Sequence, residues 1–282
     1  MSASLLPATE GFFLETDDRR RFCLFHAVAG NVRCRGAILY VPPFGEEMNK
    51  SRRMVALQAK ALAEQGFAVL LMDLFGCGDS EGECQDASWD QWKNDLGFAF
   101  SWLRQRCNVP VSLLGLRLGA LLALDFMRDE IHPVHQLVLW QPVLHGQQFL
   151  TQFFRLRLAS DLLTKNSAQA GGTQDIRQSL NTGDIVEIAG YEISSKLTAP
   201  IDALKATDFL PQNIAVHWCE IQRECTTALP PARQKTIDFW RQHQLALHMH
   251  QIEGPEFWAT QEISVCPALI EVTTKLLGAA PA

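Results

Sequence analysis

The sequence lacks several features that would place it in a distinct class of proteins. No apolar run approaches the ~18 residues of a membrane-spanning helix. The N-terminal stretch "MSASLLPATEGFF" does not join a basic start to a long apolar segment, as a secretory signal does. Basic residues are not in excess, because 25 Lys and Arg stand against 31 Asp and Glu, a formal net charge of −6. We therefore expect a cytoplasmic protein with no membrane span and no nucleic-acid partner.

Paired cysteine motifs are also missing. The eight cysteines are scattered, and no two of them form a C-x-x-C motif. This spacing argues against both a zinc knuckle and a small disulfide scaffold. We expect reduced thiols, and we expect neither a metal nor a cofactor. The chain has 282 residues, of which 47% are hydrophobic and 20% charged, the ordinary balance of a globular protein.

Short apolar runs alternate with longer helical patterns along most of the chain. The period-two stretch "RFCLFHAV" (21–28) predicts an antiparallel edge strand. Further strands are predicted at 36–43, 67–73, 111–116, 136–142, 214–221 and 245–252. Helices are predicted at 50–66, 88–107 with Ser88 as N-cap, 117–129, 232–244 and near 259–277. Strands separated by helices predict a mostly parallel sheet that is covered on both faces.

The alternation breaks between residues 146 and 205. This segment contains the apolar helical stretch "GQQFLTQFFRLRLASDLL", a polar stretch and a less periodic piece. An insertion at this place lies above the carboxyl ends of the strands, where open α/β sheets bind ligands. We therefore divide the chain into a first core part (1–145), a lid or cap insertion (146–205) and a second core part (206–282).

Two motifs follow predicted strands. The strand 111–116 runs into "GLRLG", which has a glycine two positions on either side of Arg117. A sharp turn from strand to helix requires small residues at those two positions. About 40 residues earlier, "MDLFGCGDSEG" (72–82) places Asp73 at the end of a strand, and four small residues follow it at every second position: Gly76, Gly78, Ser80 and Gly82.

These motifs resemble those of the α/β-hydrolase superfamily, whose G-x-S-x-G elbow and D-x-x-G-x-G-x-S-x-G loop they match in position. The turn "PPFG" (42–45) stands where the oxyanion loop of that superfamily stands. The resemblance covers residues 20–145 and 205–277 and implies an α/β-hydrolase fold with a lid after the sixth strand. More narrowly, "PPFGEE", "GLRLG" and "WQPVLHG" look like the second type of hydrolase that accompanies exosortase A and exopolysaccharide systems of Gram-negative bacteria.

The chain departs from the superfamily at two of the three catalytic positions. Arg117 stands at the nucleophile position, and its guanidinium stays protonated and cannot attack a carbonyl carbon. The loop after the last strand, "IEGPEFWATQEI", has no histidine, and Phe257 occupies the expected place. The acid could be Glu220 or Glu224. We therefore expect ordinary serine-hydrolase chemistry to be absent.

An arginine at such an elbow suits a negatively charged ligand. The resemblance implies that the backbone N–H groups of Phe44 and Leu118 converge on one oxyanion site, and Leu118 opens a helix whose N-terminus favours negative charge. Arg117 adds a full positive charge with a planar set of donors. We therefore expect a pocket for a small anionic or acylated molecule, lined by Gly45, Glu46, Glu47, Cys77, Phe257 and Trp258.

Other interpretations of the same residues stay open. Arg117 could pair with a carboxylate, since a partly buried arginine needs one, and the candidates are Glu46, Glu47, Glu220 and Glu256. An active ester, thioester or acyl hydrolase could use Glu220 or Glu256 as the base for water, or Cys77 as a nucleophile. The chain could also be a non-catalytic partner in an exopolysaccharide or exosortase system, docking through the apolar helix of the insertion. A homodimer is a further possibility.

Overall fold

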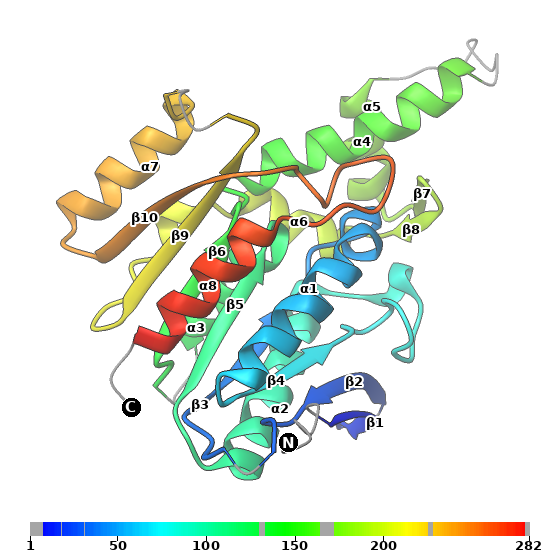
Figure 1. Cartoon of the computed structure of the whole chain (residues 1–282). Helices are drawn as coiled ribbons and strands as arrows, with labels where there is room; N and C mark the ends of the chain where they lie inside the picture. The colour runs from blue at the N-terminus through cyan, green and yellow to red at the C-terminus, as the bar shows by residue number, and fades with distance from the viewer. Residues whose placement is uncertain are drawn as a thin grey trace.

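The computed structural model describes residues 8–17, 19–30, 32–129, 133–163, 172–224 and 228–279. Its centre is an eight-stranded sheet in the order β1-β2-β4-β3-β5-β6-β9-β10 (Figure 1). The strands are β1 (Thr9–Glu15), β2 (Arg20–His26), β3 (Gly36–Val41), β4 (Phe67–Met72), β5 (Val111–Leu116), β6 (Gln136–Trp140), β9 (Ala215–Gln222) and β10 (Ala246–Glu253). Within this sheet the two pairings made by β2 are antiparallel, and the pairings from β4 to β10 are parallel.

Helices cover both faces of this sheet, as the alternating pattern predicts. One face carries α1 (Glu46–Glu64) and α8 (Pro267–Ala279), and the other carries α2 (Trp89–Cys107), α3 (Leu118–Asp129) and α7 (Pro231–Gln242) (Figure 1). Successive strand residues point to opposite faces. Leu113 therefore packs with α2 and α3, whereas its neighbour Leu114 packs with α1 and α8. The central strands are buried on both sides, which explains their nearly continuous apolar runs.

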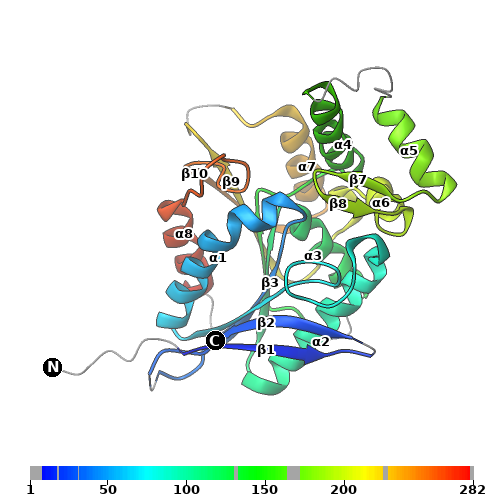
Figure 2. The ribbon, with the colours of Figure 1, turned by 90° about the vertical axis from the view of Figure 1, so that its right-hand side faces the viewer.

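The insertion between β6 and β9 forms a group of its own at one end of the sheet (Figure 2). It consists of α4 (Gly146–Leu163), α5 (Thr173–Thr182), a hairpin of β7 (Val186–Ile188) and β8 (Tyr191–Ile193), α6 (Ser195–Ala203) and the short 3-10 helix η3 (Ala206–Asp208). Its apolar residues join the core on the α2 and α3 face, among them Phe154, Ile193 and Ile201. The insertion therefore packs directly on the central domain.

The structure corrects several predicted boundaries. β2 is not the edge strand, because β1, which was not predicted, pairs along its full length. The last helix begins at Pro267 rather than near 259, since proline fits the first turn of a helix but not its interior. α1 begins at Glu46, before the predicted start at residue 50. In the described ranges no helix combines the length and the apolar character that a membrane span requires.

Candidate functional site

The turn between β5 and α3 has the geometry of a nucleophile elbow. Arg117 lies between the last residue of β5 and the first of α3, with a φ of 53°. A residue other than glycine adopts this left-handed backbone only where the surrounding structure imposes it. Here the Arg117 N–H donates to the Trp140 carbonyl (3.0 Å), and the Arg117 carbonyl accepts from the Val143 N–H (3.1 Å). The end of β6 therefore holds the turn in place.

The two glycines of "GLRLG" are required by close backbone approach. A Cβ on Gly115 would lie 2.6 Å from the Ala120 Cα. A Cβ on Gly119 would collide with the carbonyl oxygens of Val41 and Pro42. The start of α3 therefore lies directly against the end of β3, which brings the elbow next to the "PPFG" turn.

The side chain of Arg117 pairs with the first turn of α1. Its Nε donates to Glu47 Oε1 at 3.1 Å, and the two side chains are 16% and 22% exposed. The guanidinium carbon lies 5.7 Å from the ring centroid of Trp258. Of the four candidate carboxylates, Glu47 is therefore the partner. Glu46 instead accepts hydrogen bonds from Tyr191 and from Asn49.

The charge on Glu47 depends on that arginine. Burial raises the pKa of the Glu47 carboxyl, Arg117 opposes the rise, and the carboxylate of Glu256 adds to it. Glu47 Oε2 is buried and has no hydrogen-bond partner among the described residues. Arg117 likewise makes only the Nε bond there, so its two terminal nitrogens have no protein acceptor in the described ranges.

The predicted acid, Glu220, lies in β9 and is fully engaged. Its Oε1 accepts from Arg233 Nε at 2.6 Å and from Gln141 Nε2 at 3.2 Å. Its Oε2 accepts from Trp218 Nε1 at 3.0 Å. Burial raises the pKa of this carboxyl, and the nearby charge of Arg233 lowers it. Glu224 follows in the exposed loop after β9.

Sequence reasoning missed Arg233, which α7 presents to the site. Burial lowers the pKa of this guanidinium, Glu220 raises it, and the positive charge of Arg117 lowers it further. Arg117 and Arg233 are therefore close enough at this end of the sheet for the charge of one to affect the pKa of the other. Only an indirect signal for Arg233 is present in the sequence. A carboxylate inside a buried strand needs a cationic partner, but the sequence of the strand does not identify that partner.

The loop after β10 places an aromatic core where the superfamily has its histidine. Phe257 is fully buried and meets Trp140 edge-on, with ring centroids 6.1 Å apart. It also contacts the buried ring of Trp258 at 5.0 Å. Glu256 is exposed. Phe257 was predicted to line a pocket, but its ring belongs to the core between β6 and α8, because an apolar ring gains more there than at a polar opening.

The "PPFG" turn is covered by the insertion. Gly45 has a φ of 64°, and the ring of Phe44 lies 5.4 Å from that of Phe153 in α4 and 5.7 Å from that of Tyr191 in β8. In the described part of the chain, the N–H groups of Phe44 and Leu118 make no hydrogen bond. They are the two donors that the family resemblance assigned to the oxyanion site.

The glycine loop at 76–82 is hydrogen-bonded to Asp73 but does not activate its cysteine. Asp73 Oδ2 accepts from Arg52 and from the Asp79 N–H, each at 3.0 Å. Burial, together with the neighbouring Cys84 and Asp73, raises the pKa of the Cys77 thiol well above its ordinary value. A nucleophilic cysteine needs the opposite shift.

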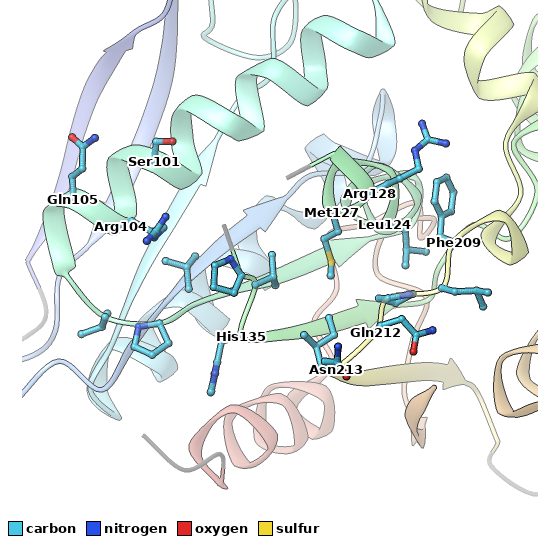
Figure 3. Close-up of a pocket in the computed structure, with 18 of the residues that line it drawn as sticks. Ser101, Arg104, Gln105, Leu124, Met127, Arg128, His135, Phe209, Gln212 and Asn213 are labelled. Atoms are coloured by element: carbon cyan, nitrogen blue, oxygen red, sulfur yellow. The ribbon is translucent and has the colours of Figure 1, made fainter. Parts of the chain in front are cut away.

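Two cavities lie away from the elbow. One of about 1350 Å³ opens at the amino ends of β5, β6 and β9, between the last turns of α2 and α3, where Arg104, Met127 and His135 line it (Figure 3). A smaller one of about 180 Å³ lies under α1. Neither includes Arg117. The described residues contain no group of histidine, cysteine or carboxylate side chains arranged to hold a metal ion.

Solved structures share this architecture. Est1E from Butyrivibrio proteoclasticus, with ferulic acid bound, superposes with a TM-score of 0.69 at 14% identity, over 94% of this chain and 97% of that one. A thermostable carboxyl esterase from Bacillus coagulans gives 0.65 at 12% identity, over 96% and 98%. A monoglyceride lipase from Saccharomyces cerevisiae gives 0.63 at 14% identity, over 98% and 96%. These matches confirm the predicted α/β-hydrolase fold.

Sequence comparison gives the family. No curated protein matches the chain. The family model described as serine aminopeptidase, S33, matches residues 33–203, more than half of the 282 residues. The matched region includes the elbow, the glycine loop and most of the insertion. The chain therefore belongs to the serine aminopeptidase S33 family of α/β-hydrolases.

Proposed function

We propose that this chain is a hydrolase-like protein that binds a small anionic or acylated molecule at the elbow and lacks the two-step chemistry of a serine hydrolase. One observation carries the proposal. At the tip of the elbow stands the guanidinium of Arg117, with one nitrogen on Glu47 and two terminal nitrogens without an acceptor among the described residues. A guanidinium with free donors is suited to a carboxylate.

The surrounding groups suit the same ligand. The free N–H groups of Phe44 and Leu118 belong to segments that meet at Gly119. The N-terminus of α3 adds a partial positive charge. A carboxylate or an acyl carbonyl oxygen between these donors and Arg117 would complete their hydrogen bonds. Glu47 would keep the guanidinium oriented by its Nε bond.

Three features favour binding over turnover. Both oxygens of Glu220 are occupied, so this carboxylate is poorly suited to activate water. The raised pKa of Cys77 disfavours a thiolate. Phe257 fills the place of the histidine with an apolar ring. The exposed Glu256 is the one predicted base that stays available.

The insertion at 146–205 would act as the lid of this site. Phe153 and Tyr191 lie on Phe44, so a ligand would enter when α4 and the β7–β8 hairpin move away. The buried aromatic rings of α4 favour this covering role over docking to a partner. A role beside an exosortase or exopolysaccharide system, which the narrower resemblance implies, and a cytoplasmic location both stay predictions of the sequence.

Thermal unfolding in the presence of ferulate and of octanoate tests the proposal. Ferulate is chosen because Est1E has a ferulic acid complex. We expect one of the two carboxylates to raise the melting temperature of the native protein, since a ligand at 100 times its Kd adds about 2.7 kcal/mol. Arg117→Met should abolish the rise. Arg128→Met is the matched control, because Arg128 is exposed and pairs with Asp125.

The outcomes separate the alternatives. Binding at the elbow would be contradicted if a carboxylate still raised the melting temperature of Arg117→Met. It would also be contradicted if neither carboxylate raised the melting temperature of the native protein. Hydrolysis of p-nitrophenyl acetate by the native protein that Arg117→Met abolishes would favour a water mechanism instead. We expect no hydrolysis above that of buffer.

A further inference from the structure

The smaller of the two cavities lies between α1 and the strands β2, β3 and β4 and has a volume of about 180 Å³. Its walls are mostly apolar and include Phe22 and Leu24 from β2 and Val55 from α1. Ala56, the next residue of α1, also lines the cavity and is exposed, so the cavity opens to solvent beside it. Arg117 does not line this cavity, which is therefore separate from the elbow site.

The cavity arises because β2 is apolar on both faces and the core covers only one of them. Successive residues of a strand point to opposite faces. Cys23 and Phe25 join the core that packs against α2. Phe22 and Leu24 point to the α1 side, and in the described part of the chain they belong to neither core cluster. Both are only partly buried, so apolar surface is left for a ligand to cover.

The volume of the cavity suits one aromatic ring. An apolar cavity of about 150 Å³, lined by aliphatic and aromatic side chains, is large enough to bind benzene. The cavity under α1 has about 180 Å³ and a lining of the same kind. It therefore has room for one six-membered ring with a small substituent, and burial of the apolar ring surface would favour binding.

The polar residues of the lining select the substituent. Arg52 Nη2 donates to Asp73 Oδ2 at 3.0 Å, and among the described residues these two are the only charged ones that line the cavity. Because their charges balance, the cavity favours a neutral molecule over an anion. Tyr40 also lines it, and the buried Tyr40 hydroxyl has no hydrogen-bond partner among the described residues. Since buried hydroxyl groups are normally paired, a ligand oxygen is the acceptor that this donor lacks.

We propose that the cavity under α1 is a second binding site and that it takes a neutral phenol, a single aromatic ring with one hydroxyl group. The ring lies against Phe22, Leu24 and Val55, and the phenol oxygen accepts a hydrogen bond from the Tyr40 hydroxyl. This site does not depend on binding at the elbow. The carboxylates that suit Arg117 are poor ligands here, because the cation of this cavity, Arg52, is already paired with Asp73.

Titration with para-fluorophenol, followed by fluorine NMR, tests the proposal on the native protein. The probe is neutral at neutral pH, because a phenol has a pKa of about 10. We expect saturable broadening of its fluorine signal. Tyr40→Phe should weaken the binding of para-fluorophenol about 5-fold, the contribution of a typical hydrogen bond, and should leave the binding of fluorobenzene unchanged. This variant should fold normally, since the hydroxyl that it removes has no partner among the described residues.

A second variant closes the cavity. Ala56→Phe should abolish the binding of both probes, because its ring would fill the opening. Lys60→Phe is the matched control, since Lys60 is exposed one turn later on the same helix and does not line the cavity. Arg117→Met should bind para-fluorophenol as the wild type does, which separates this site from the elbow. The proposal would be overturned by a wild type that shows no saturable binding or by equal losses in Ala56→Phe and Lys60→Phe. It would also be overturned by a loss in Arg117→Met, or by an unchanged affinity of Tyr40→Phe for para-fluorophenol.

Discussion

Replacing Arg117 with methionine should destabilise the protein in a pH-dependent way. Methionine replaces the unbranched stem of the arginine side chain and removes its charge and its donors. Glu47 then loses the cation 3.1 Å away, while one of its oxygens is already buried without a partner among the described residues. Removing one partner of a buried pair costs about 3–5 kcal/mol, and an exposed pair contributes about 0–1 kcal/mol. With side chains 16% and 22% exposed, we expect a loss of about 2 kcal/mol at pH 7.5.

The sign of the pH dependence follows from the pKa of Glu47. Burial raises that pKa above the ordinary value of 4.5, and Arg117 lowers it. A carboxyl with a raised pKa in the folded state contributes stability that is present below its unfolded pKa and is lost as the pH rises through its folded pKa. Without Arg117 the pKa of Glu47 in the folded state rises further. The stability of the variant therefore goes on falling up to a higher pH than that of the wild type. The cost of the substitution should therefore shrink to below about 1 kcal/mol near pH 4.5.

Urea unfolding at pH 4.5 and 7.5 measures this difference. The matched variants are Glu47→Gln and the double variant Arg117→Met/Glu47→Gln. In the double variant the pH dependence should disappear, since no buried carboxylate is left unpaired. The pairing would be refuted if Arg117→Met lowered the free energy of unfolding equally at both pH values and the second substitution did not change this loss.

Three further outcomes follow from the structure. Gly119→Ala should lower the free energy of unfolding by more than about 3 kcal/mol, because its Cβ would strike two backbone carbonyls. Arg233→Met should cost about 3–5 kcal/mol in the same assay, since it leaves Glu220 buried without its cation. The pKa of His217 is lowered to about 4 by burial and by His248 and His250. Its contribution should be present above pH 6.5 and be lost as the pH falls towards 4, which the melting temperature of His217→Gln against wild type would measure.

Each of these has an outcome that would contradict it. Gly97→Ala is the control for the first, because its Cβ would meet only a ring carbon at 3.9 Å, and alanine there should be neutral or stabilising. Equal effects of the two alanine substitutions would mean that the elbow is not tightly packed. A stable Arg233→Met protein would show that Glu220 is neutral when buried. Parallel pH profiles for His217→Gln and wild type would exclude the histidine effect.

Much of the sheet could be predicted because its central strands are buried on both faces. The run 111–116 is apolar except for Ser112, and the structure gives the same bounds for β5. β1 was missed because most of its residues are exposed at an edge, where little apolar burial constrains them. The start of α8 was misplaced because the residues before Pro267 pack as a loop, in which the Cys266 N–H bonds to the sulfur of Met54 in α1, a contact that local sequence cannot reveal.

The candidate site could likewise be predicted only in part from the sequence. The place of Arg117 at the elbow could be predicted from the sequence. The backbone approaches closely at Gly115 and at Gly119, and this spacing of two glycines is visible in the sequence. The partner of Arg117 stayed open among four carboxylates, since the answer depends on how α1 packs beside the elbow. Arg233 comes from α7, and its pairing with Glu220 depends on tertiary packing alone. The inward turn of Phe257 likewise depends on Trp140, which precedes it by more than a hundred residues.

The most direct test of the central claim is reaction of the native protein with a fluorophosphonate probe, followed by intact-mass measurement. A charged guanidinium at the elbow cannot form a covalent adduct, so we predict no gain in mass at any time point. Stoichiometric attachment of one probe molecule to a serine would show that an activated nucleophile exists elsewhere in the chain and would contradict the account.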